Sequence, residues 1–126
     1  IMKNLSSLYQ SGDWKGEKHV PVIHAPNSIK KGEIVEVNVN IGEEIAHPNT
    51  FEHHISWIKV YFKPEGRNFP IEIGSYDFAA HGEYDVFTEP SVSLKFKAEK
   101  SGTILATSYC NIHGLWENSK EIAVED

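Results

Sequence analysis

The chain of 126 residues has 12 Lys and Arg against 18 Asp and Glu, giving a formal net charge of −6. With 40% apolar and 24% charged residues, its composition is that of a folded globular domain, not of a disordered chain. The negative charge argues against non-specific nucleic-acid binding, which requires Lys and Arg to neutralise phosphates. A single Cys excludes an intrachain disulfide, and it excludes a zinc or iron–sulfur site made only of cysteines of this chain.

Membrane insertion is also not expected. No apolar run approaches the roughly 20 residues that a transmembrane helix needs, and the N-terminal residues lack the apolar stretch of a signal peptide. We therefore expect a cytoplasmic protein that folds as one domain over residues 1–126, a length within the usual range for a single domain.

The hydrophobic pattern indicates β-strands. A short helical or irregular segment is expected at the N-terminus, because residues 2–11 show only weak helical periodicity. From Ile34 to Ile41, apolar and polar residues alternate, which predicts a strand with one buried face. Residues 55–62 are apolar on nearly both faces, as is typical of a central strand. Further strands are predicted at 91–97, 103–109 and 120–124, with a weaker candidate at 69–76.

Turn residues separate these runs, as in Lys31-Gly32, Pro64-Glu65-Gly66 and Lys100-Ser101-Gly102. Short strands at this spacing, without helices between them, predict an all-β fold. The specific expectation is an immunoglobulin-like antiparallel β-sandwich of about seven strands.

The histidines and the cysteine form a pattern of their own. Cys110 follows a predicted strand and stands three residues before His113, so one turn offers a thiolate and an imidazole to a metal ion. Isolated histidines such as His24 and His81 are expected to be ordinary polar residues. Together, the positions in or next to loops predict one mononuclear metal site at an end of the sandwich: His19, His47, His53, His54, Cys110 and His113.

The donor types restrict the metal. Thiolate and imidazole exclude Mg²⁺ and Ca²⁺, which prefer oxygen, and leave zinc, copper and iron. A blue-copper-like electron carrier also has a Cys–His loop before its last strand, but here no Met follows His113. A non-catalytic binding module with a structural zinc is another alternative. Four imidazoles and a thiolate would overfill a tetrahedral zinc site, whereas a five-coordinate site with one open position suits iron.

Three segments carry a resemblance to a known family, the superoxide reductases of the one-iron type, also called neelaredoxins. The segments are Glu17-Lys18-His19-Val20-Pro21, His47-Pro48-Asn49-Thr50-Phe51-Glu52-His53-His54 and Cys110-Asn111-Ile112-His113-Gly114-Leu115-Trp116. The resemblance extends from about Ser11 to the C-terminus. It departs from the family pattern between Glu83 and Thr88, where the connecting segment is shorter.

The resemblance implies an oxidoreductase that reduces superoxide to hydrogen peroxide at one non-haem iron per chain, Fe²⁺ or Fe³⁺. It implies four equatorial ligands, His19, His47, His53 and His113, with Cys110 as the axial ligand. Glu17 corresponds to a sixth ligand of the ferric ion, and Lys18 corresponds to the cation beside the open position. His54 would be structural.

The resemblance also implies partners and surroundings. A rubredoxin-type protein would re-reduce the iron, and the chain would form a homo-oligomer, specifically a homotetramer, with no nucleic-acid or membrane partner. Leu115 and Trp116 are expected to pack near the thiolate. The backbone N–H groups of Asn111 and Ile112 are expected to donate hydrogen bonds to the sulfur.

Overall fold

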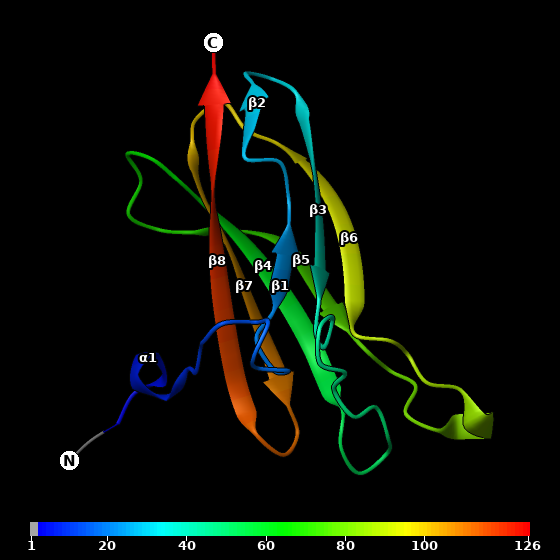
Figure 1. The fold of residues 1–126 in the computed structure, drawn as a ribbon. Coiled ribbons are helices and arrows are strands. Elements are labelled where there is room, and N and C mark those ends of the chain that lie inside the picture. The colour runs from blue at the N-terminus through cyan, green and yellow to red at the C-terminus, as the bar shows by residue number, and fades with distance from the viewer. Residues whose placement is uncertain (1–2) are drawn as a thin grey trace.

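The structure, a computed structural model, describes residues 3–126 and consists of two stacked β-sheets (Figure 1). The smaller sheet has the strand order β1-β3-β6 and the larger has the order β2-β8-β7-β4-β5. The predicted β-sandwich is therefore confirmed. The strands are β1 (Val22–His24), β2 (Ser28–Lys30), β3 (Ile34–Asn40), β4 (Ile55–Pro64), β5 (Ile71–Asp77), β6 (Ser91–Lys97), β7 (Gly102–Cys110) and β8 (Gly114–Glu125).

The observed elements differ from the predicted ones at three places. The strands β1 and β2 have three residues each, too short for an alternating pattern to identify. The strand β8 starts at Gly114, six residues before the predicted start, because its first half is held by pairing with β7. The N-terminal helix α1 (Leu5–Leu8) is a single turn capped by Asn4. The predicted helical stretch began at Met2, which lies outside the described residues.

The core lies between the sheets and follows from the alternation. In β3, Val35, Val37 and Val39 are fully buried, and the residues between them face outward. They pack against the inward side chains of the larger sheet, which include Ile58, Val60, Ile104 and Ala106. Full burial of such a side chain contributes about 1.5–3 kcal/mol, so this core provides the rigid frame on which the loops are mounted.

Strand register brings the histidine-bearing segments to one end of the sandwich. Val22 of β1 pairs with Asn40, so the segment before β1 reaches the same edge as the loop after β3. Ile55 pairs with Cys110, so that loop ends beside the β7–β8 turn. Segments 11–21, 41–54 and 111–113 therefore meet at the lower end of Figure 1.

The connection between β5 and β6, residues 78–90, projects from the same end as an arm (Figure 1). It closes as a hairpin, with a hydrogen bond from the Gly82 N–H to the Val86 carbonyl at 2.8 Å and a bridge between His81 and Phe87. The 3₁₀ turn η1 (Glu83–Asp85) lies between these paired residues. The short connection between Glu83 and Thr88 is therefore long enough to close the hairpin. Among the described residues, no helix has the length and apolar character to cross a membrane.

Candidate metal centre

Four imidazole rings form a closed four-sided arrangement at this end. Going round it, His19 to His47, His47 to His53 and His113 to His19 are each 4.8 Å apart between ring centroids, and His53 to His113 is 5.1 Å. The diagonal from His19 to His53 is 6.4 Å. Neighbouring rings are strongly inclined to each other, so their nitrogens can point at a common centre.

The cysteine thiol adjoins this arrangement. One donor atom from each of His19, His47, His53 and Cys110 lies within 4.8 Å of all the others. Nδ1 of His113 lies 3.1 Å from Nε2 of His19 and 3.9 Å from the Cys110 sulfur. Two nitrogens bound at right angles to one metal ion, about 2.1 Å from it, would be separated by roughly 3.0 Å, so the His19–His113 spacing suits adjacent ligands.

Two nitrogens of this group are buried without a hydrogen-bond partner, Nε2 of His47 and Nε2 of His53. A buried polar atom without a partner costs free energy, and a metal ion would satisfy both nitrogens. Burial lowers the pKa of His47 to about 4, although its hydrogen bond to Pro48 opposes the shift. Burial likewise lowers the pKa of His53. Both rings are therefore neutral at pH 7, the form in which imidazole binds metals.

Hydrogen bonds on the far side of two rings select the tautomer. Nδ1 of His47 lies 2.6 Å from the Pro48 carbonyl, and Nδ1 of His19 lies 2.7 Å from a Glu17 carboxylate oxygen. Carbonyls and carboxylates only accept, so Nδ1 carries the proton in both rings. The Nε2 lone pairs of both residues are then free for a metal.

Glu17 therefore contacts His19 and is not part of the group of converging donor atoms. The hydrogen bond from His19 lowers the pKa of this carboxyl, and the charge of Lys18 adds to the effect. Lys18 also lowers the pKa values of His47 and His53, behind burial and other nearby histidines. Its charge thus acts on Glu17 and on two of the four rings.

Cys110 is fully buried and ends β7. The N–H that reaches its sulfur belongs to His113, at 3.4 Å. The expectation for Asn111 was wrong, because its N–H donates to the His54 carbonyl at 3.2 Å, and for Ile112 no bond to the sulfur is seen. Trp116 is buried and stacks on His19, with ring centroids 4.8 Å apart and an interplanar angle of 12°.

Asn111 joins two of the ligand-bearing segments. Its side-chain amide donates to the Glu52 carbonyl at 3.0 Å, and its side-chain oxygen accepts from the His54 N–H at 2.9 Å. With the backbone bond to His54, the turn after Cys110 is tied to the loop that carries His53. The sequence pattern did not indicate this role, because it depends on a contact between segments distant in the chain.

The other histidines lie outside the four-sided arrangement. His54 stacks on His81 of the arm, with ring centroids 3.5 Å apart, and its Nδ1 lies 2.9 Å from the Thr50 carbonyl. His24 pairs with Glu43 at 2.6 Å on the outer face of the smaller sheet. These positions agree with the expectation that His24, His54 and His81 are not ligands.

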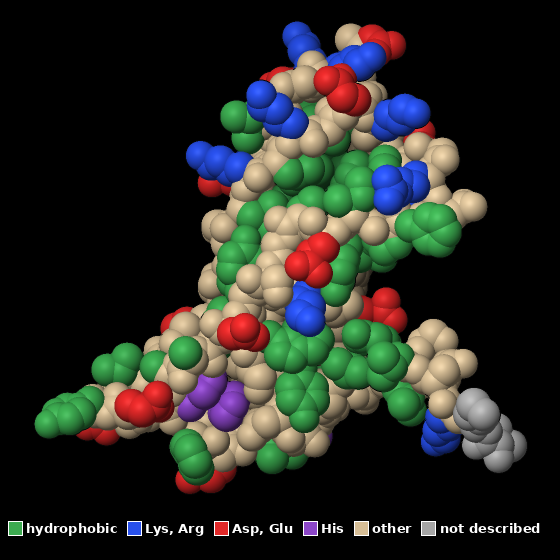
Figure 2. Space-filling model, turned by 180° about the vertical axis from the view of Figure 1, so that it is seen from behind, with side chains coloured by type: hydrophobic (Ala, Val, Ile, Leu, Met, Phe, Trp, Pro, Cys, Tyr) green, Lys and Arg blue, Asp and Glu red, His purple; other side chains and the backbone are tan. Residues whose placement is uncertain are grey.

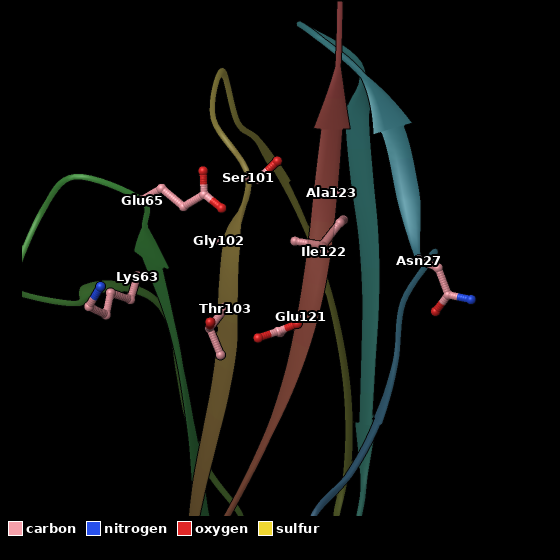
Figure 3. Close-up of a pocket in the computed structure, with 9 residues that line it drawn as sticks. All are labelled: Asn27, Lys63, Glu65, Ser101, Gly102, Thr103, Glu121, Ile122 and Ala123. Carbon is pink, nitrogen blue, oxygen red and sulfur yellow. The ribbon is translucent and has the colours of Figure 1, made fainter.

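A hollow of about 490 Å³ lies at the opposite end of the sandwich (Figure 3). It is open, and its charged lining side chains, Lys63, Glu65 and Glu121, are exposed. It contains none of the converging histidines, so this hollow is separate from the candidate centre.

Charge is distributed unevenly between the two ends. On the face in Figure 2, Lys and Arg stand among Asp and Glu at the upper end, whereas Asp and Glu lie near the histidines below. The segments that meet at the metal end carry two basic residues, Lys15 and Lys18. The acidic residues of these segments and of the arm are Asp13, Glu17, Glu43, Glu44, Glu52, Glu83, Asp85 and Glu89. Lys15 and Lys18 are therefore the two basic residues among eight acidic ones at this end.

Known proteins resemble this chain over nearly its whole length. A sequence model of the desulfoferrodoxin family matches residues 11–119. This chain belongs to the desulfoferrodoxin family. The superoxide reductase of Pyrococcus furiosus is 52% identical, with 96% of this chain and 99% of the relative aligned. The neelaredoxin of Megalodesulfovibrio gigas is 46% identical, over 96% of this chain and 98% of the relative.

Solved structures of relatives have the same fold as this desulfoferrodoxin-family chain. The reduced superoxide reductase, or neelaredoxin, of Archaeoglobus fulgidus gives a TM-score of 0.85 at 50% identity, covering 92% of this chain and 98% of the other. A Thermotoga maritima crystal structure gives 0.95 at 52% identity, covering 99% and 100%. The resemblance inferred from three motifs is thus confirmed, as is the prediction of an oxidoreductase of the superoxide reductase class.

Proposed function

We propose that this chain reduces superoxide to hydrogen peroxide at one mononuclear non-haem iron held by His19, His47, His53, His113 and Cys110. The observation that carries the proposal is the four-sided arrangement of imidazoles beside a buried thiol. Five donors exceed what a tetrahedral zinc site uses. A blue-copper site would use two imidazoles, so the other two would have no role there.

The donor set fits iron in this structure. The two unpartnered Nε2 atoms of His47 and His53 need a partner, and the tautomers of His19 and His47 leave lone pairs available. Iron, when bound, supplies the single electron that converts superoxide and two protons to hydrogen peroxide, cycling between Fe²⁺ and Fe³⁺. Cys110 and the four histidines would hold the iron together, the histidines through their imidazole nitrogens and Cys110 through its sulfur.

Cys110 must be a thiolate to bind a metal. The His113 N–H lies 3.4 Å from its sulfur and donates to it. Because Cys110 is buried, water does not compete for this hydrogen bond.

Lys18 is proposed to attract the anionic substrate. It is half-buried beside the centre, and its charge acts on Glu17, His47 and His53. A local positive charge raises the concentration of a small anion near it. In an acidic surrounding this effect is confined to the immediate neighbourhood of the site.

Glu17 is proposed to act in two ways. In the described structure its carboxylate orients His19 through Nδ1. As the sixth ligand of the ferric ion, the same carboxylate would have to release His19 and turn towards the centre. Glu17→Ala should therefore change the absorption spectrum of the ferric protein, and an unchanged spectrum would remove Glu17 from the ligand set.

Three further proposals rest on the resemblance to superoxide reductases alone. They are electron transport from a rubredoxin-type donor, assembly as a homotetramer, and location in the cytoplasm. Reoxidation of reduced rubredoxin in the presence of the iron-loaded protein and superoxide tests the first. The mass of the assembly in solution tests the second.

The central test compares two adjacent histidines. Iron-loaded wild type, prepared without oxygen, should consume superoxide and form hydrogen peroxide without releasing oxygen. His53→Ala should lose iron and activity, whereas His54→Ala, which removes a ring outside the four-sided arrangement, should retain one iron per chain. Release of oxygen in the dismutation ratio, or equal iron content in both variants, would contradict the proposal.

A further inference from the structure

Gln10 lies one residue before the part of the chain that the family model matches, and it contacts the turn that carries a proposed ligand. Its backbone is attached to β8 by two hydrogen bonds, from its N–H to the Leu115 carbonyl at 3.1 Å and from the Glu117 N–H to its own carbonyl at 2.9 Å. Figure 1 shows this N-terminal segment beside the start of β8. The Gln10 side chain thus starts from a fixed position.

The Gln10 amide contacts two acceptors. Nε2 of Gln10 lies 2.8 Å from the His113 carbonyl and 3.4 Å from the Leu115 carbonyl. Since both partners can only accept, the NH₂ group, and not the amide oxygen, must face them. A carboxylate in the same place would present lone pairs to both carbonyls and would be repelled.

The His113 carbonyl receives a second donor. Nε1 of Trp116 lies 3.3 Å from the same oxygen, and the indole of Trp116 stacks on His19. His113 itself is exposed in a three-residue turn, so core packing does not hold its position. The two donors on its carbonyl compensate for this.

We propose that Gln10 is a positioning residue of the metal centre, acting with Trp116 to fix His113 against His19 and Cys110. This inference depends on one part of the proposed function, namely that the cluster binds a metal. The N–H of His113 reaches the Cys110 sulfur, and its ring reaches His19. Without the hydrogen bonds to its carbonyl, His113 could shift and both contacts would change in length. The bond between the thiolate and the metal would then be less well defined.

Co²⁺ titration of the metal-free protein tests this, with the thiolate-to-Co²⁺ absorption band as a spectroscopic readout. Gln10→Glu has the same size but cannot donate, and Gln10→Ala removes the group. Both should weaken Co²⁺ binding by roughly tenfold, the lower end for residues that orient metal ligands, and should shift or broaden the band. Gln10→Lys, which restores a donor, should recover most of the affinity.

The matched control is Ser11→Ala. Ser11 anchors the same segment to β8 through its hydroxyl, 2.8 Å from the Glu117 carbonyl, but does not contact His113. Ser11→Ala should bind Co²⁺ with the wild-type affinity and band. Equal weakening in Ser11→Ala and Gln10→Glu, or wild-type behaviour in Gln10→Glu, would overturn the assignment to Gln10. Failure of the wild type to bind one Co²⁺ with a thiolate band would overturn the proposed site itself.

Discussion

At the scale of single residues, the centre depends on which atom of each histidine is already occupied. Glu17 and Pro48 accept from Nδ1 of His19 and His47, and this directs Nε2 of both rings inward. The partners of these rings are one and two residues away in sequence. These two rings are therefore oriented by neighbours in the sequence.

Lys18 offers a prediction at this scale. Lys18→Ala should slow the reaction with superoxide by roughly tenfold at low ionic strength, because the local attraction of the anion is lost. The remaining acidic loops repel the substrate, and added salt screens this repulsion. The rate of the variant should therefore rise with ionic strength, which stopped-flow mixing at several salt concentrations would measure.

Lys15→Ala is the matched control for Lys18. Lys15 is exposed and lies over the Trp14 ring, 5.6 Å from its centroid, so its removal should change the rate less. A wild-type salt profile for Lys18→Ala would show that this residue does not steer the substrate.

At the scale of elements, the loop between β3 and β4 turns sharply at Gly42 (φ +82°). A Cβ on Gly42 would come within 2.5 Å of the His47 backbone nitrogen. Gly42→Ala should therefore displace His47, reduce the metal content and lower the free energy of unfolding by more than the roughly 1–3 kcal/mol of backbone strain alone. Metal analysis and urea unfolding would measure both.

Gly66→Ala is the control that separates the cost of backbone strain from the cost of a steric clash. Gly66 has nearly the same φ, +84°, but a Cβ there would have no neighbour within 4 Å. It should show the strain cost alone and keep its metal. If both variants kept a full complement of metal, close packing at Gly42 would have no part in placing His47.

The base of the same loop is tied to the smaller sheet by Glu43, which contacts His24 of β1 and Asn40 of β3. The hydrogen bond to His24 lowers the pKa of this carboxyl in the folded state. The unfolded chain then binds the proton more readily, so this stabilisation is complete above the ordinary pKa of about 4.5. It is lost as the pH falls from there through the lowered folded-state pKa.

The prediction for Glu43 is a pH-dependent difference between two proteins. The free energy of unfolding of wild type should exceed that of Glu43→Gln near pH 6, and the difference should shrink below about pH 4.5. Chemical denaturation at both pH values measures it. A difference that is constant with pH would mean that the carboxylate charge does not contribute.

At the scale of the whole molecule, the hydrophobic core and the metal centre have few residues in common. The buried cluster lies between the sheets, and Cys110 is the one proposed ligand that belongs to it. We therefore expect the metal-free protein to remain folded. Metal binding should raise its stability by mass action, about 2.7 kcal/mol at 100 times the dissociation constant.

Circular dichroism and thermal unfolding with and without a chelator would test this expectation. The metal-free chain should retain its far-ultraviolet β-sheet signal and unfold at a lower temperature. Loss of that signal on metal removal at 25 °C would mean that the metal is required for the fold.

Local alternation in the sequence predicted the long strands and hence the sandwich, because the side-chain period of a strand is written into consecutive residues. The spacing of His and Cys predicted a metal site with imidazole and thiolate donors, because each motif lies within a few consecutive residues. The strands β1 and β2 and the first half of β8 could not be found in this way, because pairing partners distant in the chain stabilise them.

The tertiary structure alone decided how the donors meet and what supports them. The register of β4 on β7 places Cys110 beside the loop of His53, and Asn111 ties the two together. The contact of Gln10 with the His113 carbonyl likewise joins segments from opposite ends of the chain. Such contacts carry no local period or spacing, so the residue types that make them are visible in the sequence but their partners are not.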